Sequence, residues 1–325
     1  MYETYDKWHK IASESYLNSK EITDFGKIDH IIFAGMGGSG TVSDVFSSIL
    51  SKTNLHVSVV KGYLLPNTVN QNTLVIVTSV SGNTEETLTI LNEAREKKCK
   101  IIGFSSGGKM EEYCNKHNIE FRKINEVHSP RASLVSFVYT VLKNLEPILP
   151  IKKTDILDSI NQLEYLQSKI KSSNLNETNP ALNLAKWISG IPLVYFPSGL
   201  KTASVRFKNS LQENAKQHVI VEDVIEACHN GIVSWEKESN IKPILIEGHD
   251  DYVKTKERWN ILKEFFDTKG IDYYEIKSVQ GGILAKTMVL IYLLDYSSIY
   301  FALLNKIDPS PVNSIDFIKK RLNHA

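Results

Sequence analysis

Residues 30–40 read HIIFAGMGGSG, an apolar run that ends in a cluster of glycines. Such a run is typical of a strand buried on both faces, as in a parallel sheet covered by helices. Glycines let the backbone approach a ligand closely, and a helix that follows them offers free N–H groups and a positive dipole end. The stretch therefore predicts a strand, a loop that can hold an anion, and a helix.

Short β-rich runs alternate with helical patterns along the rest of the chain, which favours parallel sheets flanked by helices. In the first half we expect strands at 56–60, 73–78, 100–104 and 119–124 and helices at 42–50 and 84–98. In the second half we expect strands at 191–196, 243–248 and 273–276 and helices at 202–216, 252–269 and 282–305. The predicted fold class is α/β, with two doubly wound lobes that each contain a parallel sheet flanked by helices.

The length of 325 residues favours two domains. Pro147 and Pro150 flank a break in the pattern, so we expect an N-terminal domain at 1–150 with the phosphate-binding loops. The second domain, 151–325, would supply catalytic residues. A ligand is expected at the carboxyl ends of the strands, in the cleft between the lobes.

Composition excludes several classes of partner. Lys and Arg number 38 against 37 Asp and Glu, a formal net charge of +1, so no basic field recruits nucleic acid. The N-terminus lacks an apolar signal segment, and the run from Met288 to Leu294 is too short to cross a bilayer. We expect a cytoplasmic protein with no membrane partner.

The three cysteines lack the spacing of metal ligands, and no metal site is expected. Cys228 adjoins His229 and could be a thiol nucleophile, but nothing nearby supplies the third member of a triad. A buried structural cysteine is the favoured interpretation.

The first loop, 35–40, fits G-x-G-x-x-G and by itself allows a dinucleotide site. Such a site expects an acidic residue after the next strand, where this chain has Lys61, Gly62 and Tyr63. A lysine could accept the 2′-phosphate of NADP, so the pattern weakens NAD more than NADP.

A second loop, 79–84, reads SVSGNT and opens a helix with two glutamates. Ser79, Ser81 and Thr84 place three hydroxyls around one turn where free amides also point, which suits a dianionic phosphate. The alternative is N-capping, in which one hydroxyl satisfies the start of the helix. Three hydroxyls beside a second glycine loop exceed what a cap requires, so we favour phosphate binding.

GMGGSG followed by SVSGNTEET resembles the sugar isomerase (SIS) domain, the phosphosugar-binding fold of phosphoglucose isomerases and glucosamine-phosphate synthases. Some members of that superfamily only sense sugar phosphates. The resemblance therefore implies sugar-phosphate binding and leaves catalysis to be argued from other residues.

Aldose–ketose isomerisation needs a carboxylate over C1 and C2, a cation for the developing oxyanion and an acid/base for ring opening. Four segments offer candidates: SPRASL at 129–134, LQENAK at 211–216, EACHNG at 226–231 and GGILAK at 281–286. With the C-terminal stretch 287–322, they resemble the bifunctional phosphoglucose/phosphomannose isomerase family over nearly the whole chain.

That resemblance implies a role for each candidate residue. Glu213 would carry the proton between C1 and C2, Arg131 would stabilise the enediolate, and His229 would open the ring with help from Lys286. The phosphate would be held by Gly37, Gly38, Ser39, Ser79, Ser81 and Thr84. The family is dimeric and its ring-opening histidine serves the partner's site, so His229 is expected to act across a homodimer interface. No cofactor is implied.

The chain departs from the family where a polar residue is expected before the lysine, because it has Val279 and then Gln280. The preference between glucose 6-phosphate and mannose 6-phosphate is therefore open. Three alternatives to the isomerase remain. They are a non-catalytic sugar-phosphate sensor, an NADP-dependent oxidoreductase that uses only the first loop, and the isomerase half of an amidotransferase. The last would need an N-terminal nucleophile, which Met1-Tyr2-Glu3 does not provide.

Overall fold

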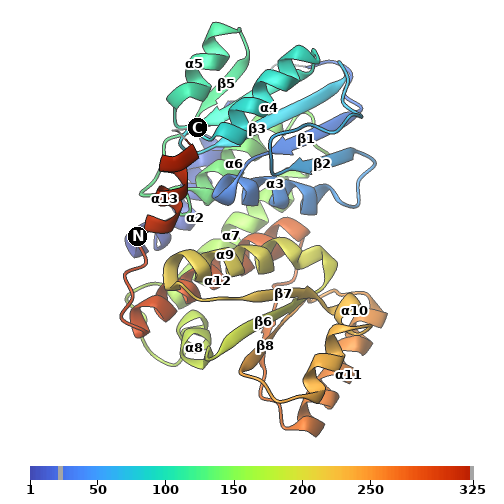
Figure 1. Ribbon diagram of the computed structural model, residues 1–325, viewed down its shortest axis with the longest axis vertical. Coiled ribbons are helices and arrows are strands. Elements are labelled where there is room, and N and C mark those ends of the chain that lie inside the picture. Colours follow the sequence, from blue (N-terminus) through green and yellow to red (C-terminus); the bar gives the residue numbers. More distant parts are fainter. Residues whose placement is uncertain (21–24, 323–325) are drawn as a thin grey trace. The chain divides into compact units, whose positions relative to one another are not determined.

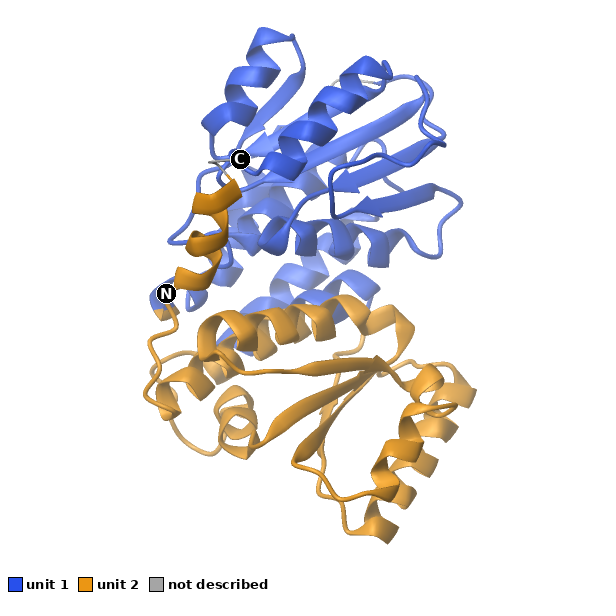
Figure 2. Cartoon of the chain, in the orientation of Figure 1, with its two compact units in different colours: residues 1, 3–167, 281–288 blue, residues 2, 168–280, 289–325 orange. Residues whose placement is uncertain are grey.

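The computed structural model describes residues 1–20 and 25–322. It divides into two compact units (Figure 2). Unit 1 comprises residues 1, 3–167 and 281–288, and unit 2 comprises residues 2, 168–280 and 289–325. These units are defined by contacts and are not contiguous stretches of chain, so the domain boundary expected at residue 150 stays a prediction.

Unit 1 contains a five-stranded sheet in the order β2-β1-β3-β4-β5, with parallel pairing throughout (Figure 1). Its strands are β1 (His30–Ala34), β2 (His56–Val60), β3 (Thr73–Ser79), β4 (Lys100–Ser105) and β5 (Glu120–Lys123). Every residue of β1 and β3 is buried, whereas the edge strand β2 is partly exposed. The apolar runs seen in the sequence are therefore the central strands of a sheet covered on both faces.

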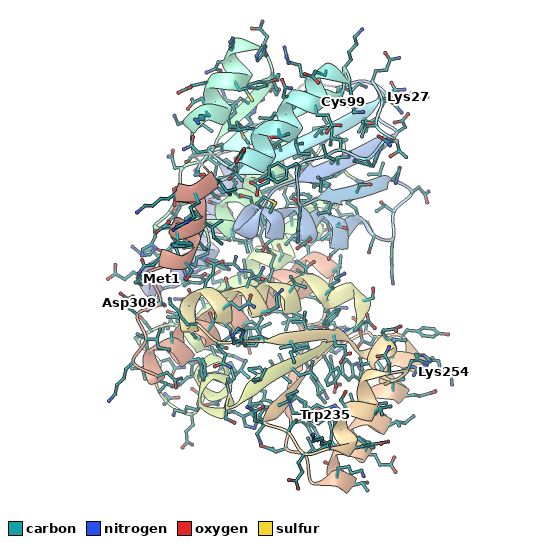
Figure 3. All side chains as sticks on the ribbon, in the orientation of Figure 1. Met1, Lys27, Cys99, Trp235, Lys254 and Asp308 are labelled. Atoms are coloured by element: carbon teal, nitrogen blue, oxygen red, sulfur yellow. The ribbon has the colours of Figure 1, made fainter. Side chains whose placement is uncertain are left out.

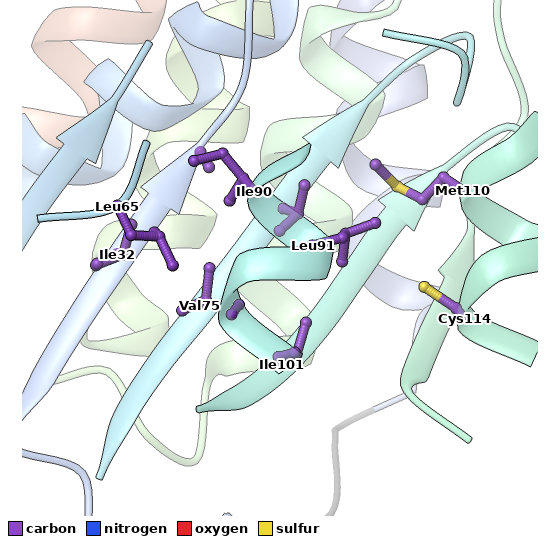
Figure 4. Packing of buried hydrophobic residues seen from close by; sticks show 11 residues of the cluster. Ile32, Leu65, Val75, Ile90, Leu91, Ile101, Met110 and Cys114 are labelled. Atoms are coloured by element: carbon purple, nitrogen blue, oxygen red, sulfur yellow. The ribbon is translucent and has the colours of Figure 1, made fainter. Parts of the chain in front are cut away.

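Helices cover this sheet on both sides. The helices that begin in this part of the chain are α1 (Tyr2–Tyr5), α2 (Trp8–Leu17), α3 (Gly37–Leu50), α4 (Glu85–Glu96), α5 (Gly108–Lys116), α6 (Leu134–Leu145) and α7 (Lys153–Ile170). On one face, Ile90 and Leu91 of α4 pack with Met110 of α5 against Ile32 and Val75 of the strands (Figure 4). Each such buried side chain contributes about 1.5–3 kcal/mol of hydrophobic stabilisation. The strands that lead into the loops are thereby held rigidly.

Unit 2 contains a four-stranded parallel sheet in the order β7-β6-β8-β9. Its strands are β6 (Ile191–Phe196), β7 (Ile220–Asp223), β8 (Ile241–Glu247) and β9 (Tyr274–Lys277). Its helices are α8 (Pro180–Trp187), α9 (Lys201–Ala215), α10 (Val224–Ala227), α11 (Val253–Lys269), α12 (Ile283–Leu304) and α13 (Asn313–Leu322), with 3-10 turns at Ser198–Leu200 and Gly231–Glu236. The first six residues of α12 belong to unit 1.

Local sequence explains where several of these helices begin and end. The side chain of Asn179 accepts hydrogen bonds from the amides of Ala181 and Leu182, and Pro180 occupies the first turn of α8. Helix α11 ends at Gly270, which adopts the left-handed conformation typical of a C-terminal glycine. These positions are start and stop signals readable from sequence.

Helix α12 is long and apolar enough to cross a membrane by length and composition alone, but 83% of its most apolar window is buried inside the fold. A helix that is apolar all round is also what the core of a two-lobed protein requires. Its Asp295 is fully buried and forms a bidentate ion pair with Arg206 of α9, at 2.7 Å between Nη2 and Oδ2. Ser210 donates a further hydrogen bond to the same carboxylate.

The α/β fold with two parallel, helix-flanked sheets is confirmed. Several helices, among them α5, α6 and α7, were not expected, and two further details were wrong. The helix expected at 42–50 begins at Gly37, inside the glycine loop, and β7 was not expected at all. Glycine disfavours helix interiors, which hid the start of α3, and the sequence IVED of β7 is too short and polar to stand out.

Candidate active site

Two helices of unit 1 begin at the point where the strand order of its sheet changes direction, between β1 and β3. Strands β1 and β3 are neighbours in the sheet, and each leads directly into a helix, α3 and α4. In open parallel sheets, ligands bind at this point, outside the carboxyl ends of the strands. Both loops singled out from the sequence, 35–40 and 79–84, therefore lie at the same edge of one sheet.

Neither helix start is capped by a described side chain. Met36 precedes α3 and Thr84 precedes α4, and neither position has a side-chain cap hydrogen bond in the part of the chain that the structure describes. The first turns of both helices thus keep N–H groups available, with the positive ends of their dipoles beside them. This finding argues against the N-capping interpretation of Thr84.

The hydroxyls of the second loop organise the turn itself. Ser79 Oγ accepts a hydrogen bond from the amide of Gly82 at 3.1 Å and shares another with Thr84 Oγ1 at 3.0 Å. Ser81 is exposed, and its Oγ accepts from the amide of Asn83 at 3.3 Å. Ser79 is buried whereas Thr84 is half-buried. The turn is held by Ser79, which leaves Ser81 and Thr84 at its accessible side.

Ser39 joins the two loops. Its Oγ, in the first turn of α3, accepts a hydrogen bond at 3.1 Å from the amide of Val80, which lies 41 residues away in the chain. Both residues are buried. This hydrogen bond ties the loop that opens α3 to the loop that opens α4, so the amides and hydroxyls of both lie close to one another, as an anion site requires.

A third loop, 105–108, supports the second one and was missed by the sequence analysis. Ser106 Oγ donates to the carbonyl of Val80 at 2.7 Å, and the amide of Met110 donates to the carbonyl of Gly82 at 2.9 Å. Gly82 has a φ of +68°, and a Cβ there would collide with the carbonyl oxygen of Gly107. The sequence SSGG after the fourth strand repeats the composition of the other two loops, and that signal could have revealed it.

Arg131 lies beside the first loop. A Cβ on Gly38 would sit 3.2 Å from the carbonyl oxygen of Pro130 and 3.7 Å from the Cα of Arg131, so the start of α3 packs directly against this turn. Arg131 is buried, with 7% of its surface exposed. Arg131 occupies the turn just before α6, which begins at Leu134.

Lys286 belongs to the part of α12 that is assigned to unit 1, and it is half-buried. The glycines before it adjoin α7: a Cβ on Gly281 would lie 3.0 Å from Asp158 Oδ2. Val279 and Gln280 lie in the preceding loop, where Ser278 Oγ donates to the carbonyl of Val279 at 3.2 Å. No described contact decides which of the two could face a sugar.

Glu213 and His229 belong to unit 2. Glu213 is half-buried on the last turn of α9, and His229 lies in the turn that follows α10. That turn packs on Glu222, since a Cβ on Gly231 would lie 2.6 Å from Glu222 Oε1. Burial and then the charge of Glu226 raise the pKa of Glu222. The two catalytic candidates are thus carried by different loops of one sheet.

In unit 2 the strand order reverses between β6 and β8, but a carboxylate lies in the loop that follows β8. After β8, Asp251 Oδ2 accepts hydrogen bonds from the amide of Gly248 at 2.9 Å and from Trp259 Nε1 at 3.0 Å. An incoming anion would be repelled by this side chain. The loops of unit 1 are therefore the better candidates for an anion site.

The dinucleotide alternative loses its remaining support. Lys61, which could have accepted a 2′-phosphate, forms an ion pair with Asp44 of α3. The negative charge of Glu86, in the acidic first turn of α4, raises the pKa of the phenol of the neighbouring Tyr63. An additional phosphate there would meet a paired lysine and two carboxylates.

Comparison with known proteins identifies both units. Residues 25–145 match the SIS domain, and residues 177–322 match the bacterial phospho-glucose isomerase C-terminal SIS domain. A bifunctional phosphoglucose/phosphomannose isomerase of Caldicellulosiruptor bescii is 33% identical over 91% of this chain and 90% of its own length. A protein of the same name from Aquifex aeolicus is 29% identical over 96% and 98%. Among solved structures, tagatose-6-phosphate ketose/aldose isomerase from Escherichia coli superposes with a TM-score of 0.72 at 13% identity, covering 95% of each chain.

Proposed function

Because the chain belongs to the bifunctional phosphoglucose/phosphomannose isomerase family, we propose that it interconverts glucose 6-phosphate and mannose 6-phosphate with fructose 6-phosphate. The observation that carries the proposal is the pair of uncapped helix starts at one sheet edge, joined by the hydrogen bond from the Val80 amide to Ser39 Oγ. This arrangement suits a phosphate monoester, which presents several acceptor oxygens to amides and hydroxyls at once.

In this proposal the phosphate lies between the first turns of α3 and α4. Amides of Gly37, Gly38 and Ser39 would bind it from one side, and Ser81 and Thr84 would donate hydroxyls from the other. Ser79 would bind it less directly, because its Oγ is already engaged by Gly82 and Thr84. The sugar then extends towards Arg131, which lies against Gly38.

The isomerisation passes through a cis-enediolate. Glu213 would take the proton from C2 of an aldose or C1 of the ketose and return it to the other carbon. The guanidinium of Arg131 would stabilise the negative charge that develops on the enediolate oxygens. Glucose 6-phosphate and mannose 6-phosphate differ only at C2, so both collapse to the same enediolate and one base can serve both.

Ring opening requires a separate acid/base, which we assign to His229 with Lys286 assisting. His229 lies at the far end of β7 from Glu213, so we propose that it acts on the site of a second copy in a homodimer. The protein would work in the cytoplasm without a metal or other cofactor, and its partner molecules would be hexose phosphates.

The reaction can be tested by nuclear magnetic resonance. Fructose 6-phosphate is incubated with the purified protein in deuterated water, with no metal or nicotinamide added. We expect both aldose phosphates to form, with deuterium at C2 wherever the proton held by Glu213 exchanges with solvent before it is delivered. Tight binding of fructose 6-phosphate by calorimetry without any turnover would instead identify a sugar-phosphate sensor, and loss of turnover with a chelator would overturn the cofactor-free mechanism.

The role of Glu213 can be tested in the same assay. Glu213→Gln should reduce kcat by about 10²–10⁴-fold, as for loss of a general base, while binding of fructose 6-phosphate remains nearly intact. Glu264→Gln, on the exposed side of α11, is a matched control that should retain full activity. Loss of binding together with turnover would show that Glu213 has a structural role instead.

A further inference from the structure

Helix α9 ends at an unusual residue for its backbone shape. Lys216 adopts the left-handed conformation, with φ of 55° and ψ of 30°, and its amide donates to the carbonyl of Leu211. The next amide, of Gln217, donates to the same carbonyl at 3.2 Å. Glycine is the usual residue in this position because a Cβ is disfavoured there. Lys98 and Lys306 adopt the same conformation after α4 and α12, so Lys216 is distinguished by the contacts that its side chain makes.

The side chain of Lys216 connects the end of α9 to a distant segment. Its Nζ donates to three backbone carbonyls: Glu213 at 2.8 Å, Pro311 at 2.9 Å and Asp308 at 3.2 Å. Asp308, labelled in Figure 3, and Pro311 lie in the chain between α12 and α13. An ammonium group has three N–H donors, so the three carbonyls use all of them.

The carbonyls at the end of a helix have no partner within the helix, so its last turn frays readily. One side of this turn is anchored in the core, where the fully buried Asn214 donates to Ser298 Oγ of α12 at 2.8 Å. The Arg206–Asp295 ion pair fixes α9 to α12 two turns earlier. Glu213 precedes Asn214 directly, and the carbonyl of Glu213 is held by Lys216 on the side away from the core. A positive charge at a helix C-terminus also favours the helix dipole.

We propose that Lys216 is a positioning residue for Glu213. Its ammonium clamps the carbonyl of Glu213 to the segment 308–311 and so fixes the orientation of the carboxylate that moves the proton. The inference rests on the proposed function of Glu213. A purely structural cap would change stability alone, whereas a positioning residue changes the chemical step, because a small misplacement of a catalytic group strongly lowers its rate.

The test compares Lys216→Gly, Lys216→Met and Lys216→Arg in the full-length protein, with the exposed Lys256→Met of α11 as control. Lys216→Gly removes the clamp and also relieves the left-handed backbone, so its unfolding midpoint in urea should equal or exceed that of the wild type. Its kcat should nevertheless fall about tenfold, while KM for fructose 6-phosphate changes less than about twofold because the phosphate loops are intact. Lys216→Arg should retain more activity than Lys216→Met.

Hydrogen exchange gives a readout that does not depend on turnover. The amides of the last turn of α9 should exchange faster in Lys216→Gly and Lys216→Met than in the wild type or Lys256→Met. A wild-type kcat in Lys216→Gly, or a rise in KM without a fall in kcat, would overturn the inference. If that result accompanied an inactive Glu213→Gln, only the inference would fail. An active Glu213→Gln would instead remove the proposed role of Glu213 and the inference with it.

Discussion

Glu213 and His229 lie at opposite ends of strand β7. Glu213 is on the turn of α9 that leads into the strand, and His229 follows the short helix α10 that leaves it. Figure 1 shows β7 pointing from the end of α9 towards α10. A strand of this length spans roughly 13 Å. This separation is consistent with the proposal that Glu213 and His229 serve the sites of different copies.

Mixing two inactive variants tests this relationship. Glu213→Gln and His229→Ala are purified separately, mixed and allowed to exchange subunits. If His229 serves the partner's site, each heterodimer gains one complete site, and random exchange should restore about a quarter of wild-type activity. If His229 acts within its own copy, each site lacks one of the two groups, and mixing should restore nothing.

Thr84→Val tests the phosphate cradle. The substitution keeps the shape of the side chain but removes the hydroxyl beside Ser79 Oγ at the start of α4. Losing one hydrogen bond to a charged ligand should raise KM about tenfold, with a smaller effect on kcat. Thr89→Val, on the exposed side of the same helix, is the control and should leave KM unchanged. An unchanged KM in Thr84→Val would exclude that hydroxyl from substrate binding.

The buried Arg206–Asp295 ion pair should stabilise the fold only when both partners are present. Arg206 and Asp295 have 2% and 0% of their side chains exposed. Arg206→Met leaves an unpaired buried carboxylate and should lower the free energy of unfolding by about 3–5 kcal/mol in urea titrations. The double variant Arg206→Met/Asp295→Leu should be more stable than Arg206→Met. Equal stability of the two would mean that the carboxylate is not strained by loss of its partner.

Stability should fall in mild acid because of His30. Its ring stacks on His56 with centroids 3.9 Å apart, and its Nε2 lies 2.9 Å from Ser58 Oγ. Burial, and then the neighbouring His56, lower the pKa of His30 below its ordinary value of 6.5, although Asp29 opposes the shift. The unfolded chain therefore binds a proton at His30 more readily than the folded chain does. The contribution of neutral His30 to the free energy of unfolding is full above about pH 6.5 and is lost as the pH falls below that value.

The measurement is the urea midpoint of the wild type and of His30→Phe between about pH 7.5 and pH 5. His30→Phe keeps a ring against His56 but cannot titrate, so its midpoint should fall less over this interval. His9 and His128 also have pKa values lowered by burial, and their contributions remain in both proteins. Parallel curves for the two proteins would show that His30 does not couple to folding.

Much of the fold could be predicted from the sequence because buried parallel strands are apolar along their whole length. The strands at 30–34, 56–60 and 191–196 have the bounds that their apolar runs indicate. Strand β7 escaped prediction because it is an edge strand of four residues with two carboxylates. Its place in the sheet comes from pairing with β6, which local pattern does not encode.

The candidate site divides in the same way. Free amides, glycines and hydroxyls at a helix start are local features, so loops 35–40 and 79–84 could be predicted directly as a candidate anion site. The SSGG composition of loop 105–108 is a local signal as well. Its support of loop 79–84 is not, because Ser106 and Met110 donate hydrogen bonds to residues more than twenty positions away.

The sequence by itself determined that this protein has two α/β lobes and that its first lobe carries two glycine- and hydroxyl-rich loops at helix starts. Apolar periodicity and the conformational freedom of glycine are properties of short segments. Only the tertiary structure decided that Ser39 joins those loops, that Asp251 closes the equivalent edge of the second sheet, and that Glu213 and His229 are separated by the length of β7. These relationships depend on strand order and pairing, which bring together residues far apart in the chain.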